Sequence, residues 1–229
     1  MLVEKKVFEL PRYTTRGGAV LRNVRIGWES YGRLNRDRSN AILVTHYFSA
    51  TSHAAGRYAA DDALPGYWDA IIGPGKAIDT DKFFVLLSDT LVNLNARDPN
   101  VVTTGPASAP ALPGRDPAQA LSHRFMIEDA LDQLAALRAG TADANNFLYL
   151  IRANQLAGAD PARIKAPTLL LYSPTDLLFP QPWIERTAAA IRGAGTPIDM
   201  APLHGPNGHL NGVLHIGQAS ARVAAFLAA

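Results

Sequence analysis

Two residues that could move a proton stand in turns near the end of the chain. Asp176 lies in S-P-T-D-L-L-F-P, after an apolar run at 168–173, and His209 lies in H-G-P-N-G-H-L, after a run at 197–203. An aspartate that orients a histidine, which then takes a proton from a nucleophile, is the acid–base part of a catalytic triad. Taken alone, Asp176 also fits the role of an ordinary turn aspartate, and His209 that of a surface histidine. As a pair after consecutive strands, they are predicted to meet at one sheet edge within hydrogen-bond distance.

A third candidate is the loop T-H-Y-F-S-A-T-S-H, which follows an apolar run at 41–46. A loop that leaves a buried strand can direct a backbone N–H at developing negative charge, which is the task of an oxyanion hole. The alternative is an ordinary Ser- and Thr-rich loop between a strand and the next element.

The nucleophile of such a triad is not found. No G-x-S-x-G or G-x-S-x-x-G stretch occurs in the 229 residues, although hydrolases of this type place their serine in that strand-to-helix turn. Ser108 lies in a loop bounded by prolines and lacks the geometry of the turn, so we do not expect it to substitute.

Other catalytic and metal chemistries have little support. The chain has no cysteine, which excludes disulfides, thiolate nucleophiles and cysteine metal sites. The histidines at 204, 209 and 215 lie close together in sequence, but no carboxylate or cysteine completes a metal-ligand spacing. We predict no metal site and no cofactor, and we expect structural hydrogen bonds from His46, His53 and His123.

The pattern of apolar residues predicts strands that alternate with helices. Residues 20–31 alternate, with Val24, Ile26 and Trp28 on one face and Arg25 and Glu29 on the other, which indicates an antiparallel strand with one wet face. We expect it to pair with residues 3–10. Continuous apolar runs predict strands buried on both faces at 41–46, 82–89 and 167–173, and 197–203 is a further strand. Helices are predicted at 118–139, ended by Gly140, at 143–157 with Asp143 as cap, and at 182–192 and 210–227.

These elements indicate one open α/β domain with a mostly parallel sheet flanked by helices. Hydrophobic residues make up 48% and charged residues 18% of the chain, which excludes a disordered protein. The formal charge is only +2 and the basic residues are scattered, so we expect no nucleic-acid partner. No signal peptide and no apolar stretch of about 20 residues is seen, so we expect a cytoplasmic protein without a membrane partner.

Three segments carry a resemblance to a known family. They are Y-G-R-L-N-R-D-R-S-N-A-I-L-V-T-H (31–46), G-Y-W-D-A-I-I-G-P-G-K-A-I-D-T-D (66–81) and T-G-P-A-S (104–108). They resemble the homoserine O-acetyltransferases, which are acyltransferases with the α/β-hydrolase fold, and G-P-G-K-A-I-D-T is the most specific match. The segment D-A-N-N-F-L-Y-L (143–150) and the turns with Asp176 and His209 are similar to the C-terminal half of that family.

The resemblance implies roles for three residues. Phe48 would donate an oxyanion-hole N–H, Asp176 would be the triad acid and His209 the base. In the family an acyl group passes from acetyl-CoA, here a co-substrate, to a serine and then to the hydroxyl of homoserine. The family also has an aspartate after its catalytic histidine that contacts the amino group of homoserine. Leu210 stands in that place, which argues against homoserine as the acceptor.

The resemblance also indicates that the domain is shortened in its middle. About a dozen residues, 109–120, stand where the family has a strand, the serine turn, another strand and most of a helical lid, and they join an N-terminal half (1–108) to a C-terminal half (121–229). Two missing strands would leave a gap of about 10 Å. We therefore expect residues 41–46 to pair in parallel with 168–173.

Three functions follow as alternatives. The first is an acyltransferase of the homoserine type, inactive or impaired because its nucleophile is missing. The second is a non-catalytic relic or binding module, and the third is an esterase-type hydrolase. The expected partners are a small-molecule substrate and, since the family often dimerises through its lid, a second copy of the chain.

Overall fold

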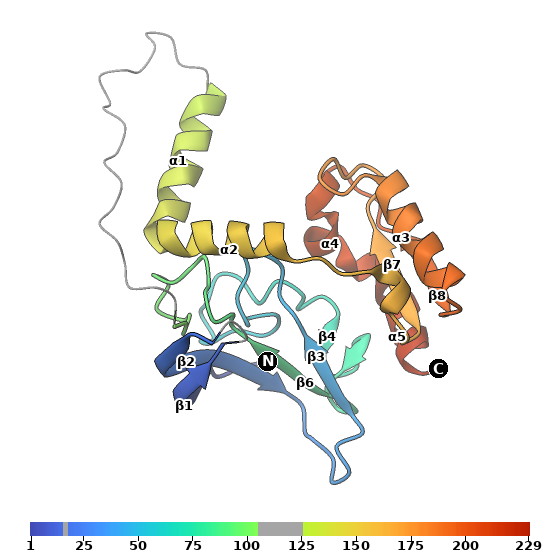
Figure 1. Cartoon of the computed structure of the whole chain (residues 1–229), viewed down its shortest axis with the longest axis horizontal. Helices are drawn as coiled ribbons and strands as arrows, with labels where there is room; N and C mark the ends of the chain where they lie inside the picture. Colours follow the sequence, from blue (N-terminus) through green and yellow to red (C-terminus); the bar gives the residue numbers. More distant parts are fainter. Residues whose placement is uncertain (16–17, 105–125) are drawn as a thin grey trace.

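The computed structural model describes residues 1–15, 18–104 and 126–229 (Figure 1). Its N-terminal part forms a four-stranded sheet in the order β1-β2-β6-β3. The strands are β1 (Lys6–Thr14), β2 (Val20–Tyr31), β3 (Ala41–Val44) and β6 (Phe84–Ser88). β1, β2 and β6 pair antiparallel, whereas β3 pairs parallel with β6. The predicted N-terminal hairpin is therefore confirmed, as are strands within 41–46 and 82–89.

The C-terminal sheet consists of two parallel strands, β7 (Thr168–Tyr172) and β8 (Ile198–Pro202). They are connected by α3 (Gln181–Gly193), which has Pro182 in its first turn, where a missing N–H is tolerated. The other elements are β4 (Ile72–Gly73), β5 (Ile78–Asp79), α1 (Met126–Thr141), α2 (Ala144–Leu156), α4 (Asn211–Leu214) and α5 (Ser220–Leu227).

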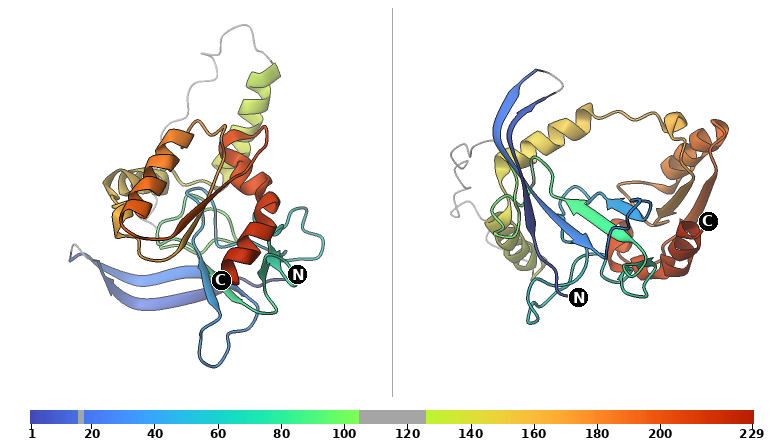
Figure 2. Two further views of the ribbon diagram at one scale, coloured as in Figure 1. Left: turned by 90° about the vertical axis from the view of Figure 1, so that its right-hand side faces the viewer. Right: turned by 90° about the horizontal axis from the view of Figure 1, so that it is seen from below.

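Within the part of the chain that the structure describes, the two sheets do not join, and the prediction that residues 41–46 pair with residues 168–173 is wrong. β3 is the last strand of the N-terminal sheet, and among the described strands β7 pairs only with β8. Figure 2 shows the two sheets apart, with α2 and the chain after it running from one to the other.

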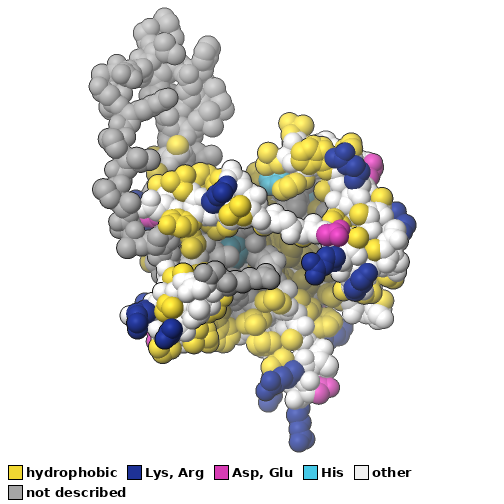
Figure 3. Space-filling view, viewed as in Figure 1, with side chains coloured by type: hydrophobic (Ala, Val, Ile, Leu, Met, Phe, Trp, Pro, Cys, Tyr) yellow, Lys and Arg dark blue, Asp and Glu magenta, His cyan; other side chains and the backbone are white. Residues whose placement is uncertain are grey.

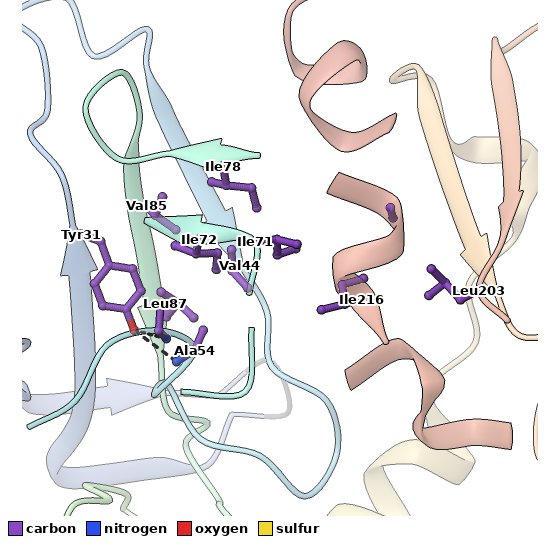
Figure 4. Close-up of a cluster of buried hydrophobic side chains, with 12 residues drawn as sticks. Tyr31, Val44, Ala54, Ile71, Ile72, Ile78, Val85, Leu87, Leu203 and Ile216 are labelled. Atoms are coloured by element: carbon purple, nitrogen blue, oxygen red, sulfur yellow. Dashed lines mark hydrogen bonds between the residues drawn. The ribbon is translucent and has the colours of Figure 1, made fainter. Parts of the chain in front are cut away.

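Side-chain packing, rather than strand pairing, holds the halves together. One hydrophobic cluster includes Val44 of the N-terminal part and Leu203 and Ile216 of the C-terminal part (Figure 4). The indole N–H of Trp68 also donates a hydrogen bond of 3.0 Å to the carbonyl of Gly212. These contacts fix the C-terminal part against the N-terminal part without pairing β7 with β3.

β3 is less buried than predicted. Val44 is buried, but the side chain of Leu43 on the opposite face of the sheet is exposed, and no second described strand pairs with β3 besides β6. The prediction of a strand buried on both faces is therefore wrong at Leu43. An exposed apolar edge of this kind can template the addition of another strand, so it is a liability for aggregation.

The observed start of α2 agrees with the sequence prediction, whereas the observed end of α1 differs from it. Asp143 caps α2 as predicted, because its carboxylate accepts a hydrogen bond of 2.9 Å from the N–H of Asn146. α1 continues through Gly140 to Thr141, so the prediction that Gly140 follows the helix is wrong.

The predicted helix at 210–227 is interrupted. α4 and α5 are separated by His215 and a 3-10 turn at 216–219. Gly212 and Gly217 weaken the helical preference of this segment.

Several predictions fall on residues that the structure does not describe. They concern Ser108, His123, the junction at 109–120 and the start of the helix at 118–139. The division of a single domain into halves at this junction stays a prediction. No helix in the described ranges is long and apolar enough to cross a membrane.

Glu29 on β2 is fully buried, so its predicted place on a wet face is wrong, although Arg25 on that face is exposed. Lys5 Nζ forms an ion pair with the Glu29 carboxylate at 3.1 Å. The hydroxyls of Tyr31 and Tyr58 donate hydrogen bonds to the same carboxylate at 2.9 and 2.6 Å. The segment that follows β3 brings Tyr58 over this face, which excludes water from it.

The same buried cluster includes His53 and a second carboxylate. His53 Nδ1 lies 3.1 Å from Glu29, and Lys5 Nζ lies 3.4 Å from the buried carboxylate of Asp89. Burial acts to raise the pKa of Glu29, but the hydrogen bonds from His53 and Tyr58 and the charge of Lys5 outweigh it and hold that pKa below its ordinary value. Glu29 is therefore ionised at neutral pH and pairs with Lys5 inside the fold.

Candidate active site

Asp176 and His209 meet at the carboxyl edge of the C-terminal sheet. Asp176 follows β7 and His209 follows β8, and His209 Nδ1 lies 2.9 Å from Asp176 Oδ2. Gly208 adopts a φ of +54°, and a side chain there would approach the carbonyl of Thr175 to 3.1 Å, so glycine suits this turn. The predicted hydrogen-bond contact between the two side chains is confirmed, whereas their catalytic role stays a prediction.

The turn after β7 keeps Asp176 ionised. Its Oδ1 accepts hydrogen bonds from the N–H groups of Leu178 and Phe179 at 2.8 and 3.0 Å. Burial acts to raise the pKa of the Asp176 carboxyl, but the hydrogen bonds from His209 and these two N–H groups hold it below its ordinary value. A neutral His209 that donates its Nδ1–H to this carboxylate leaves Nε2 free to accept a proton, as a general base requires.

A buried amide holds the His209 turn against β7. Asn211 is fully buried, and its Nδ2 donates to Ser173 Oγ at 2.9 Å and to the carbonyl of Gly205 at 3.1 Å. Its Oδ1 accepts from the N–H of Asn207 at 3.2 Å. Sequence reasoning missed Asn211, because an asparagine in a glycine-rich turn carries no sign that it is buried.

Replacing Asn211 with alanine should lower the free energy of unfolding by about 1–3 kcal/mol, because the buried hydroxyl of Ser173 and the half-buried carbonyl of Gly205 lose their donor. Urea denaturation measures the change. Asn145→Ala is the matched control, since Asn145 is half-buried on α2 and its side chain makes no hydrogen bond to the described residues. A loss no larger than that of the control would contradict the role assigned to Asn211.

The predicted oxyanion loop faces the same pocket as His209. Tyr47, Phe48 and Ser49 of this loop line a cavity of about 750 Å³ together with Phe179 and His209, and α2 closes one side. This volume is within the usual range for small-molecule sites. No described residue accepts a hydrogen bond from the N–H of Phe48. The structure therefore brings Phe48, Asp176 and His209 to one place.

The remaining histidines behave as expected where they are described. His46 Nδ1 lies 2.8 Å from the carbonyl of Tyr47, and His53 contacts Glu29. Within the described ranges, no group of three His, Asp or Glu side chains is arranged to hold a metal ion.

Comparisons with known proteins support the fold. No family model matches the chain. It is 52% identical over 99 residues to a homoserine O-acetyltransferase of Methanococcoides burtonii, covering 43% of this chain and 19% of that protein. It is 46% identical over 92 residues to a homoserine O-succinyltransferase of Magnetococcus marinus, covering 40% of this chain and 22% of that protein. The chain thus spans about a fifth of the length of the curated relatives that it matches.

Solved structures match over almost the whole chain. Esterase E22 has a TM-score of 0.90 at 29% identity, over 99% of this chain and 100% of that one. The homoserine O-acetyltransferase of Bacillus anthracis has a TM-score of 0.85 at 23% identity, over 99% and 98% of the two chains, which supports the fold. The chain has the α/β-hydrolase fold, and over about two fifths of its length it is similar to homoserine O-acetyltransferases.

No nucleophile is identified among the described residues. Of the described serines, Ser49 lines the pocket of His209, and Ser173 lines a smaller adjoining cavity with Asp176 and His209. Ser173 is buried and its hydroxyl accepts the hydrogen bond of Asn211. Neither serine is hydrogen-bonded to His209, and neither lies in a strand-to-helix serine turn.

Proposed function

We propose that the cavity is an acyl-transfer or ester-cleaving site in which Asp176 and His209 are the acid–base pair and Phe48 supplies an oxyanion donor. The observation that carries the proposal is the 2.9 Å Asp176–His209 hydrogen bond at the sheet edge, beside a cavity that Phe48 also lines. The acyltransferase names of the sequence relatives and the esterase name of a structural neighbour support this class of chemistry.

The finer proposal is transfer of an acyl group from a CoA thioester to a hydroxyl acceptor. Without the serine turn, His209 Nε2 would act directly on a bound hydroxyl or water. The oxygen attacks the acyl carbon while its proton passes to Nε2, and this proton then goes to the departing group. General-base assistance of this kind contributes about 10²–10⁴-fold, well below the contribution of a complete triad, so we propose that the chain is impaired.

Two other functions compete with this one. Ester hydrolysis, with water as the acceptor, is favoured by the similarity to esterase E22 over the whole chain. A binding module that keeps the pocket without turnover is favoured by the missing serine turn. Slow hydrolysis that depends on His209 would indicate a catalytic site, whereas its absence would indicate a binding module.

The experiment is the hydrolysis of p-nitrophenyl acetate and of acetyl-CoA by the full chain. We expect a slow reaction that His209→Ala lowers by about 10²-fold or more, to the uncatalysed rate. His204→Ala is the matched control, because His204 is exposed and its side chain makes no hydrogen bond to the described residues. Equal rates for the wild type and His209→Ala would overturn the proposal of a catalytic site.

A further inference from the structure

A buried asparagine from a distant segment supports the Phe48 loop, residues 47–50. Asn93 lies beyond the end of β6, is fully buried, and donates its side-chain amide to the carbonyl of Ala50 at 3.1 Å. Its Oδ1 accepts a hydrogen bond of 2.9 Å from the N–H of Asn95, and the side-chain amide of Asn95 donates to the carbonyl of Ser49 at 2.9 Å. Two successive carbonyls of the loop are therefore held by side chains of one short segment.

These hydrogen bonds act on the peptide unit that carries the Phe48 N–H. The N–H of Ala50 donates to the carbonyl of Tyr47 at 2.9 Å, which closes a tight turn over residues 47–50. The carbonyl of Tyr47 and the N–H of Phe48 belong to one planar trans peptide and point in opposite directions. Holding Ala50 in place therefore fixes the direction of the Phe48 N–H.

The same asparagine connects the loop to α2. The backbone carbonyl of Asn93 accepts a hydrogen bond of 2.8 Å from Nδ2 of Asn146, and the ring of Phe147 lies edge-to-face with that of Phe48 at 6.0 Å. Within α2, all of which the structure describes, Asn146 is the one buried residue. Large apolar residues such as Leu148 are exposed, and Figure 3 shows hydrophobic side chains at the surface over α2. A buried amide contact, rather than an apolar core, therefore links the helix to the segment of Asn93.

We infer that Asn93 is a positioning residue for the proposed oxyanion donor, because it holds the Phe48 loop and α2 in one fixed arrangement. The inference rests on the proposed function for its effect on turnover, whereas its effect on the loop can be measured without turnover. Asn93 has no solvent exposure, so it acts through the backbone of residues 47–50 and not by contact with a substrate.

Asn93→Ala tests the inference, because alanine removes both the donor to Ala50 and the acceptor for Asn95. Backbone amide relaxation, measured by NMR on the full chain, reports the order of each N–H. We expect the order parameter of Phe48 to fall from about 0.85 in the wild type to below about 0.6 in the variant, with β7 and β8 unchanged.

The kinetics of p-nitrophenyl acetate hydrolysis give a second measurement. Loss of an oxyanion donor costs about 10²–10³-fold in kcat, and a donor that is loosened but still present should cost less. We expect kcat of Asn93→Ala to fall about tenfold at an unchanged KM, because the donor acts on the charge that develops in the transition state.

Two further variants make the test specific. Asn100→Ala is the matched control, because Asn100 is exposed on the same segment and its side chain makes no hydrogen bond to the described residues. Asn95→Ala removes only the donor to Ser49 from a half-buried position, so it keeps the inference testable if Asn93→Ala does not fold. It should lower the order parameters of Phe48 and Ser49 to values between those of the wild type and about 0.6.

The outcomes separate this inference from the proposed function. Loss of order in the loop of Asn93→Ala but not of Asn100→Ala, with a lower kcat at the same KM, supports the inference. If His209→Ala leaves turnover unchanged, the proposed function fails, and the order parameters alone decide whether Asn93 holds the loop. A loop that stays rigid in Asn93→Ala and Asn95→Ala, or equal losses in the control, would overturn the inference. So would loss of order without a change in kcat in a chain whose turnover depends on His209.

Discussion

The protein should form no acyl-enzyme with a thioester donor and should not react with a fluorophosphonate. A nucleophilic serine must lie about 3 Å from the base nitrogen and beside the oxyanion donors. The G-x-S-x-G turn supplies both the serine and one of those donors, so its absence removes covalent catalysis and part of the oxyanion hole together. We expect turnover about 10⁴–10⁶-fold below that of an enzyme with an intact triad. Intact-protein mass spectrometry after each reagent measures the modification.

An esterase with an intact G-x-S-x-G serine, treated in the same reaction, is the positive control. Stoichiometric labelling of one serine that His209→Ala abolishes would contradict the prediction and identify the missing nucleophile. Ser49→Ala and Ser173→Ala would then show whether either of the described serines beside His209 is that residue.

Replacing Lys5 with methionine should lower the free energy of unfolding by about 3–5 kcal/mol. Lys5 lies between the carboxylates of Glu29 and Asp89, both of which have no solvent exposure, at 3.1 and 3.4 Å. Methionine keeps most of the side-chain volume but leaves two buried negative charges without their cation, and breaking a buried pair in this way is strongly destabilising. Denaturation in urea at pH 7 measures the change.

Lys6→Met is the matched control, because Lys6 is the neighbouring residue on β1 and contacts no carboxylate among the described residues. Its ammonium group lies over the ring of Trp28 and 3.2 Å from Ser30 Oγ. We expect the control to change stability by less than about 1 kcal/mol. Similar losses in both variants would show that the buried ion pairs add little to stability.

The dependence on pH gives the prediction a second measurement. In the wild type the pKa of Glu29 is below its ordinary value of 4.5, so its stabilisation is complete above that pH and is lost as the pH falls through the lower, folded-state value. In Lys5→Met, burial of Glu29 remains while the cation is gone. The deficit of the variant should therefore shrink as the pH falls towards 4.5, and a deficit independent of pH would contradict this explanation.

Local patterns in the sequence determined much of the fold. The continuous apolar runs predict β3, β6 and β7 as strands, although β7 is only half-buried along its length. Asp143 is recognisable as the cap of α2 because a cap acts on N–H groups within its own turn. The contact between Asp176 and His209 was also predictable, since consecutive parallel strands end at the same sheet edge.

Only the tertiary structure decided the features that depend on distant residues. Alternation along β2 places Glu29 on a wet face, but Lys5, His53 and Tyr58 come from other segments and close over it. Trp68 and Ile216 join the halves through side-chain contacts, which no pattern in β3 or β7 reveals. Burial and long-range pairing are properties of the assembled chain, whereas periodicity and capping act within a few residues, and the sequence alone therefore determines the elements of this protein but not how its two halves meet.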